Sequence, residues 1–238
     1  MEHEHSAESI RKRLAAGPRL NYVRDWIYGG IDGSVTTFAI VSGVVGADLS
    51  PPVILVLGFA NLVADGFSMA AGNYMGTRAE KEDLKHLEAV EHRHIDVIPE
   101  GEREEVRQIY EEKGFQGAEL ERVVDLITAD RERWVQTMLT EEYGLPREVR
   151  SPWLAAASTF SAFVLCGMAP LIPFLFGLRD AFWLSTLLTG AVFFAIGSIK
   201  SRWSTIPWWR SGLETLLVGS AAAGLAYVIG ALLGDLAR

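Results

Sequence analysis

Two aspartates, Asp32 and Asp65, lie within long apolar stretches of the sequence, at 26–47 and 52–75. If these stretches cross a membrane, both carboxylates fall at or near the middle of the bilayer, where a charged side chain costs about 2.5–3.5 kcal/mol on insertion scales. Acids at that depth usually face the interior of a helix bundle or a water-filled path. Each aspartate is therefore a candidate for a role in transport.

Four side chains follow one another at four-residue intervals in the second stretch: Asn61, Asp65, Met69 and Asn73. On a helix, this spacing places them on one slowly drifting stripe. Carboxylate oxygens suit Mg²⁺, Ca²⁺ and Mn²⁺, and a thioether shifts the preference toward softer transition metals. Two structural alternatives remain open, because methionine commonly fills gaps in a core and asparagine commonly forms hydrogen bonds between membrane helices.

An acidic segment follows the second apolar stretch, and it carries side chains that bind metals at three- or four-residue spacing. The candidates are Glu88, Glu91 and His94, then Glu102 and Glu105, then Met138, Glu141 and Glu142. Three helix faces that carry carboxylate, imidazole and thioether groups favour Fe²⁺, Mn²⁺, Co²⁺ or Zn²⁺ over Mg²⁺. A solvated helix face is the alternative interpretation, since glutamates are common on such helices.

Five segments are long and apolar enough to cross a bilayer, which needs roughly 20 mainly apolar residues. They are residues 26–47, 52–75, 153–177, 181–199 and 212–233. Polar residues interrupt the first span around Asp32, so we expect it to be buried among the other helices. Pro170 and Pro173 predict a kink in the third span. Glu214, near the start of the fifth, is expected to be a buried acid, either in the transport path or in an ion pair.

Small residues and a single cysteine indicate how the spans pack. Gly29 with Gly33, and Gly72 with Gly76, form GxxxG pairs, which allow helices to approach closely. Cys166 is the only cysteine, which excludes a disulfide within the chain and a thiolate metal cage. We expect it to be a packing residue, because it lies in an apolar segment.

Charge divides the chain into two parts. Residues 80–148 contain 20 acidic and 10 basic residues, a net charge of −10, whereas the remainder has a net charge of +2. The expected order is a cytosolic tail (1–24), spans 1 and 2 (25–77), an acidic metal-binding domain (78–148) and spans 3 to 5 (149–238). Basic residues before span 1 and between spans 4 and 5 place the N-terminus and the insert in the cytosol and the C-terminus outside. Nucleic acid is not an expected partner.

The predicted fold class is all-α, a five-span bundle with a three-helix insert between spans 2 and 3. The first insert helix, at 77–97, is expected to continue span 2 and to end at the Pro-Glu-Gly sequence of 99–101. The other two are expected at 102–113 and 117–143, where apolar residues recur at helical spacing. The first 20 residues lack the apolar core of a signal peptide and are expected to form a disordered tail.

Several longer motifs cover nearly all of the chain after residue 20. They are RDWIYGGIDG at 24–33, VTTFA at 35–39, ANLVADGFSM at 60–69, PEGE at 99–102, Pro170 with Pro173, and SGLE at 211–214. In these motifs the sequence resembles the vacuolar iron transporter family of membrane Fe²⁺/Mn²⁺ carriers, in the short form that lacks an N-terminal ferritin-like domain. The resemblance implies a five-span homodimer with a path between protomers, and proton antiport that drives metal out of the cytosol.

The resemblance also assigns roles to individual residues. The family's mid-membrane carboxylate and methionine fall on Asp32 and Met69. Its insert ligands fall on Glu91, Glu102, Glu105, Met138 and Glu142. Two positions depart from the family pattern: His94 stands where the family often has Glu, and Leu139 follows Met138 where a second Met occurs. These departures concern the affinity, stoichiometry and metal preference of the insert.

The predicted function is transport of Fe²⁺, or Mn²⁺, out of the cytosol in exchange for protons. The metal (Fe²⁺, Mn²⁺, Co²⁺ or Zn²⁺) is bound substrate, no cofactor is obligatory, and no enzymatic activity is expected. Proton and metal compete for Asp32, and Asp65 either carries a second proton or holds Asp32 in place. Two alternatives are a membrane-anchored metal sensor and a di-iron ferroxidase. The Glu-x-x-His pattern at 91–94 suggests the ferroxidase. Without a targeting segment, a bacterial plasma membrane is the expected location.

Overall fold

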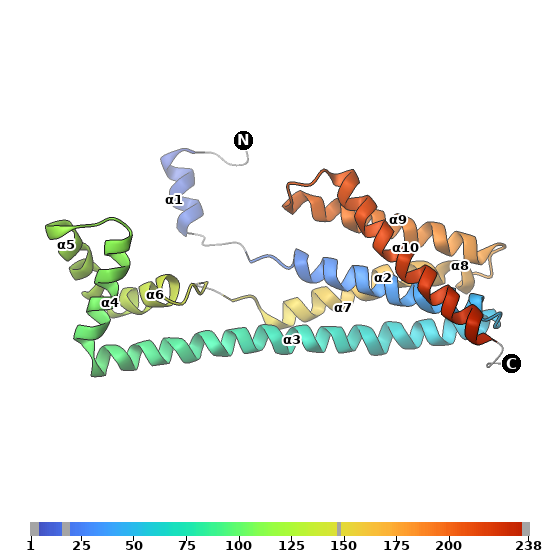
Figure 1. The fold of residues 1–238 in the computed structure, drawn as a ribbon, viewed down its shortest axis with the longest axis horizontal. Helices are drawn as coiled ribbons and strands as arrows, with labels where there is room; N and C mark the ends of the chain where they lie inside the picture. Colours follow the sequence, from blue (N-terminus) through green and yellow to red (C-terminus); the bar gives the residue numbers. More distant parts are fainter. Residues whose placement is uncertain (1–4, 16–19, 147–148, 235–238) are drawn as a thin grey trace. The chain divides into compact units, whose positions relative to one another are not determined.

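The computed structural model describes residues 5–15, 20–146 and 149–234, and over this part of the chain it contains helices and no strands (Figure 1). Four helices are long and apolar enough to cross a membrane, namely α2 (Val23–Gly46), α3 (Pro51–Val97), α9 (Ala181–Lys200) and α10 (Trp208–Leu233). The fifth candidate span, Pro152–Leu175, consists of α7 (Pro152–Met168), the 3-10 helix η1 (Ala169–Leu171) and α8 (Ile172–Leu175). The predicted all-helical fold with five spans is confirmed.

The chain divides into two compact units. One comprises Met1–Met75 and Pro152–Arg238, and we call it the bundle unit; the other comprises Gly76–Ser151, and we call it the insert unit. The prediction that residues 77–97 continue span 2 is confirmed, because α3 is one helix from Pro51 to Val97. The prediction of a disordered N-terminal tail is wrong for part of it, since α1 (Ala7–Ala15) is helical, although none of its residues is buried.

Helix α2 lies at the centre of the bundle unit, as its polar composition predicted. It packs against α7, α9 and α10, and it is the most buried of the five candidate spans (Figure 1). Two glycines bring α2 and α7 together: a Cβ at Gly29 would lie 2.2 Å from the carbonyl oxygen of Thr159, and one at Gly33 would lie 2.3 Å from that of Phe163. The second predicted GxxxG pair is not used in this way, because a Cβ at Gly72 or Gly76 would meet no other atom within 4 Å.

The third span changes conformation at its prolines, as predicted. The α-helical segment ends at Met168, and Pro170 lies in the 3-10 turn η1. The carbonyl oxygen of Pro170 accepts a hydrogen bond of 2.7 Å from the hydroxyl of Ser185 in α9, which satisfies it within the bundle. Cys166, one turn earlier, is buried against α2, and a Cβ at Gly30 would lie 3.1 Å from its sulfur.

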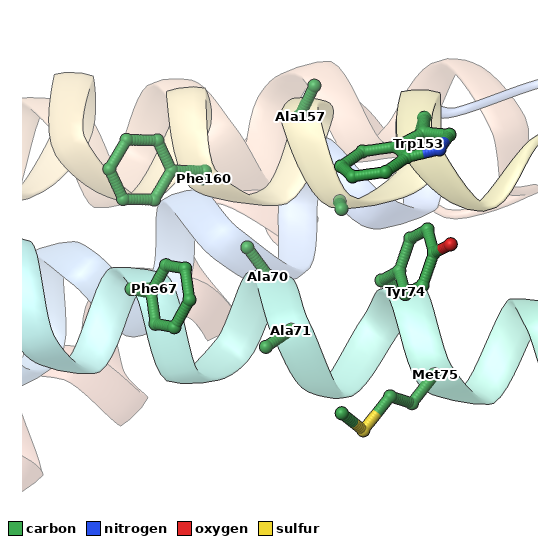
Figure 2. A pocket seen from close by; sticks show the side chains of 9 residues that line it. Phe67, Ala70, Ala71, Tyr74, Met75, Trp153, Ala157 and Phe160 are labelled. Carbon is green, nitrogen blue, oxygen red and sulfur yellow. The ribbon is translucent and has the colours of Figure 1, made fainter.

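An apolar groove of about 400 Å³ lies between α3 and α7 in the bundle unit (Figure 2). Its walls are Phe67, Ala70, Ala71, Tyr74, Met75, Trp153, Ala156, Ala157 and Phe160. Figure 2 shows Tyr74 opposite Trp153, and the two ring centroids are 4.7 Å apart. The groove holds almost no polar surface, so it does not resemble a cation site.

The insert unit contains α4 (Pro99–Glu112), α5 (Gly117–Thr128) and α6 (Arg131–Glu141) in addition to the C-terminal part of α3. Its core includes Val106, Val124, Val135 and Met138, all fully buried. The prediction of three insert helices is wrong in one place, because the segment 117–143 forms two helices. Asp130 begins the second of them by accepting a hydrogen bond of 2.9 Å from the backbone N–H of Arg133, as an N-cap residue does. The predicted end of the first insert helix is confirmed, because α3 ends at Val97 and Pro99 is the first residue of α4.

Candidate metal sites in the bundle and the insert

Asp32 on α2 and Asp65 on α3 are brought together in the bundle unit. Both side chains are half-buried, and they are close enough for their charges to repel each other. A pair of carboxylates in membrane-spanning helices is costly unless a proton or a cation offsets the charge. Two carboxylates at such a position would be stabilised by a proton or by a bound cation.

The two asparagines of the predicted stripe hold helices together. The side-chain amide of Asn61 donates to Thr36 Oγ1 at 3.1 Å and to Thr37 Oγ1 at 3.3 Å, both on α2. The amide of Asn73 donates to Asp25 Oδ1 at 3.0 Å and, on α7, to Thr159 Oγ1 at 2.7 Å. These contacts match the structural alternative, in which asparagine links neighbouring helices.

The hydrogen bond from Asn73 indicates a structural role for Asp25. The Asp25 side chain is only 4% exposed, and its carboxylate accepts the hydrogen bond from Asn73. Spacing alone places Asp25 on the same helix face as Asp32, because the two are seven residues apart. The structure separates their roles, since Asp25 is tied to Asn73 and Asp32 lies near Asp65.

Met69 and Glu214, the remaining bundle candidates, lie in different surroundings. Met69 is half-buried and packs against the apolar core that includes Phe38 and Phe163. Glu214 is exposed on α10 in the single chain, so the prediction of a buried acid is wrong. Among the described residues, neither Lys200 nor Arg210 forms a salt bridge with it.

A compact cluster in the insert unit joins two buried glutamates to a histidine. One potential ligand atom from each of Glu91, His94 and Glu102 lies within 4.8 Å of the other two. His94 Nδ1 is 3.2 Å from Glu102 Oε1 and 3.9 Å from Glu91 Oε1. The Glu91 and Glu102 residues are 1% and 4% exposed, respectively, which is unusual for glutamate. Glu91 and His94 are three residues apart on α3, and Glu102 is supplied by α4.

One oxygen of each buried glutamate has no hydrogen-bond partner among the described residues. Glu91 Oε1 accepts a hydrogen bond of 3.1 Å from the Tyr143 hydroxyl, whereas Glu91 Oε2 and Glu102 Oε2 are buried and accept none from the described residues. Burial, the neighbouring charges of Glu91 and Glu105, and a hydrogen bond shared with Glu91 together raise the pKa of Glu102 to about 8. Such a site favours binding either a proton or a divalent cation.

Glu105 and Glu142 lie at the edge of this cluster. Both are exposed, and each interacts electrostatically with the buried acids. Burial, followed by the charges of Glu105 and Glu91, raises the pKa of Glu142. These two glutamates can therefore add negative charge, and further oxygen ligands, around Glu91 and Glu102.

The other three predicted ligands lie in different surroundings. Met138 is completely buried in the apolar core of the insert unit. Glu141 forms a salt bridge with Lys113. Glu88 lies instead with His92 and Glu132, whose potential ligand atoms are within 4.8 Å of one another.

The group around His92 is better described as an ion-pair network. Arg131 Nε donates to His92 Nδ1 at 3.0 Å, and the same guanidinium holds Asp96 through two hydrogen bonds of 2.6 and 2.7 Å. The Arg131 hydrogen bond lowers the pKa of Asp96. Because the Arg131 Nε–H donates a hydrogen bond to His92 Nδ1, the lone pair of that nitrogen is already used and is not free for a metal.

Sequence spacing missed Tyr143 and the Arg131 network. Tyr143 follows Glu142 but lies outside every three- or four-residue repeat of ligands, and only the fold brings its hydroxyl to Glu91. Burial and the hydrogen bond to Glu91 raise the pKa of Tyr143, so it remains a proton donor. No pattern in the sequence indicates that Arg131 reaches back to His92.

Comparison with known proteins agrees with this combination of features. The VIT family profile matches residues 23–231. A vacuolar iron transporter of Toxoplasma gondii is 34% identical over 225 residues, covering 90% of this chain and 74% of the relative. Vacuolar iron transporter 1 of Arabidopsis thaliana is 30% identical, covering 92% and 87%, and that of Eucalyptus grandis is 31% identical, covering 86% and 84%. These relatives are membrane iron transporters rather than enzymes, and the chain belongs to the VIT family.

Proposed function

We propose that this protein moves Fe²⁺, and also Mn²⁺, out of the cytosol in exchange for protons. The observation that carries the proposal is the pair formed by Asp32 and Asp65 on two candidate membrane spans. A scaffold or a membrane-anchored sensor needs no acids at that depth, where each is costly. Relatives that share 28–34% of their residues with the chain are named vacuolar iron transporters, which supports metal as the cargo.

The insert unit would supply metal to the membrane. Its buried Glu91 and Glu102, with His94, offer carboxylate and imidazole ligands suited to Fe²⁺, Mn²⁺, Co²⁺ or Zn²⁺. The surrounding acidic residues attract cations and raise their local concentration. We propose that this site binds the metal before it enters the membrane path.

Asp32 and Met69 would bind the metal inside the membrane. Protonation of Asp32 weakens metal binding, because the neutral acid no longer balances the charge of the cation. Loss of that proton on the cytosolic side restores the site. In this scheme, Asp65 either takes a second proton or keeps Asp32 in position.

We further propose that the functional unit is a homodimer. Asp32 and Asp65 remain half-exposed at the surface of a single bundle. A half-exposed carboxylate pair facing lipid would be strongly disfavoured, whereas a second copy would enclose it and a water-filled path. The insert and N-terminus would lie in the cytosol, and a bacterial plasma membrane stays our prediction for the host membrane.

Flux into proteoliposomes tests the proposal. Fe²⁺ entry is followed with a trapped metal dye, with and without an imposed pH gradient. We expect gradient-dependent flux from the native protein and none from Asp32→Asn, which keeps the size of the side chain but removes its charge. Asp180→Asn is the matched control, since Asp180 is exposed and its φ of 58° suits asparagine.

The same assay separates transport from the alternative functions. Normal flux from correctly folded Asp32→Asn would exclude coupling through this acid. Metal binding by the full chain without any flux would favour the sensor. If the flux of Mn²⁺, Co²⁺ or Zn²⁺ exceeds the flux of Fe²⁺, the proposed mechanism stands and the transported metal is a different one.

A further inference from the structure

Basic and aromatic side chains gather where α9 ends and α10 begins. Lys200 is the last residue of α9, Arg202 lies in the 3-10 helix η2 (Ser201–Trp203), and Arg210 lies in the first turn of α10. Three tryptophans are exposed in the same segment, Trp203 by 56%, Trp208 by 59% and Trp209 by 47%. Exposed tryptophan next to lysine and arginine at the ends of membrane helices is typical of the headgroup level of a bilayer.

A cavity of about 550 Å³ opens at this junction. It is lined by Ser198, Ile199, Ser201, Arg202, Ile206 and Trp208. The Trp208 ring packs edge-on against Phe194 of α9, with the centroids 5.9 Å apart, so its wall of the cavity is held in place. The cavity therefore combines one guanidinium group with an aromatic and an aliphatic surface.

No acid in the described part of the chain forms a salt bridge with the cations at this junction. Across residues 5–15, 20–146 and 149–234, Lys200, Arg202 and Arg210 make no salt bridge, and the Arg210 guanidinium lies 5.1 Å from the Trp209 ring centroid. Ser198, which also lines the cavity, has a buried hydroxyl that makes no hydrogen bond within the described chain. An oxygen-rich anion, or a water that it orders, would satisfy both the positive charge and this hydroxyl.

We propose that the α9–α10 junction binds the phosphate-bearing headgroup of an anionic phospholipid. Arg202 would bind the phosphate, since a guanidinium offers several donors in one plane. Lys200 and Arg210 would add positive charge, and Trp208 with Ile206 would contact the glycerol and the start of the acyl chains. This apolar wall favours a lipid over free phosphate, because free phosphate has no apolar part that could contact Trp208 and Ile206. Basic pockets between membrane helices bind lipid headgroups for the same physical reason.

Lipid titration of the full-length protein in neutral detergent tests the assignment. The melting temperature is followed as phosphatidylglycerol, phosphatidylcholine or inorganic phosphate is added. We expect phosphatidylglycerol to stabilise the native protein at lower concentration than phosphatidylcholine, and inorganic phosphate to have no effect. Arg202→Gln should raise the midpoint of the phosphatidylglycerol titration about fivefold, the effect of roughly one basic side chain at an anionic surface.

Two further variants make the result specific. Arg202→Lys keeps the charge and should retain most of the effect, whereas Arg179→Gln should behave as the native protein because Arg179 precedes the opposite end of α9. If Arg202→Gln does not fold, Lys200→Gln with Arg210→Gln provides the same comparison. Equal responses to the two lipids, an equal loss in Arg179→Gln, or an equal shift with inorganic phosphate would each overturn the proposal.

Discussion

The bundle unit and the insert unit treat their buried acids differently. In the bundle, Asp25 accepts a hydrogen bond from Asn73, and the Asn61 amide is shared between Thr36 and Thr37. In the insert, Glu91 and Glu102 each keep one buried oxygen without a partner among the residues described. A hydrogen-bonded group can serve the fold alone, whereas an unpartnered buried carboxylate destabilises the fold unless something binds to it. The difference points to the insert glutamates as ligands.

The two units also differ in how their helices meet. In the bundle, glycines allow backbones to touch, as at Gly33 beside Phe163 and at Gly230 beside Gly43. In the insert, the core is built from larger side chains such as Val124, Trp134 and Met138. Close backbone contact replaces the hydrophobic effect, which provides no driving force between helices surrounded by lipid.

The largest effect should come from filling a glycine contact in the bundle. Gly33→Val would place a side chain against the Phe163 carbonyl, which belongs to the backbone and cannot turn aside. We expect a loss of about 3 kcal/mol or more of stability, measured as the melting temperature in detergent. Gly72→Val is the control, because a Cβ there meets no atom within 4 Å in the single chain. Equal losses in both variants would show that the contrast between the two GxxxG pairs does not hold.

The next effect should distinguish ligands from structural acids. Glu91→Gln or Glu102→Gln should weaken metal binding at least about tenfold, or about 1.4 kcal/mol. When no metal is present, the same variants should melt at a higher temperature than the native protein above about pH 8, where Glu102 is ionised and the buried site carries an unbalanced charge. Glu141→Gln is the control, since Glu141 pairs with Lys113. Lower stability without metal in all three variants would indicate structural roles.

The pH dependence of the metal-free protein should follow the raised pKa of Glu102. A carboxyl whose pKa is higher in the folded protein favours the folded state while it is protonated. Its contribution is complete below about pH 4.5 and is lost as the pH rises through about 8. The melting temperature should therefore fall across this range and fall less in Glu102→Gln. Metal should stabilise the native protein most at the upper end, and an unchanged slope in the variant would contradict the assignment.

The smallest effect should be confined to one helix of the insert. Asp130→Ala removes the N-cap hydrogen bond to the Arg133 N–H and should cost about 1 kcal/mol. Amide hydrogen exchange should show faster exchange at the start of α6 than elsewhere. Gln116→Ala is the matched control, because the Gln116 side chain makes no capping hydrogen bond to α5. Faster exchange throughout the insert would mean that Asp130 supports the whole unit.

The sequence was sufficient to predict features set by composition and periodicity. Five apolar stretches predicted the five spans, and the polar character of the first predicted that α2 would be central. The break at Ala129–Asp130 was missed because the apolar spacing of 117–143 continues across it, while a single N-cap residue starts a new helix.

The candidate sites were less predictable, because spacing along one helix cannot show which neighbours a side chain meets. Glu88 and Glu91 are one turn apart, yet one lies with His92 and the other with His94 and Glu102. Asn61 and Asn73 share a stripe with Asp65, yet tertiary contacts with Thr36, Thr37 and Asp25 give them structural roles. Glu214 was expected to be buried because it belongs to an apolar helix, but the lateral surface of such a helix also exposes polar residues.

The buried position of Cys166 makes the protein well suited to site-directed labelling. It is the only thiol in the sequence, and its 7% exposure against Gly30 shields it from maleimide reagents in the folded protein. A cysteine introduced on an exposed helix face can therefore be modified selectively without replacing the native one. Spin labels attached in this way would show whether two copies of the chain associate, through the distances between their labels.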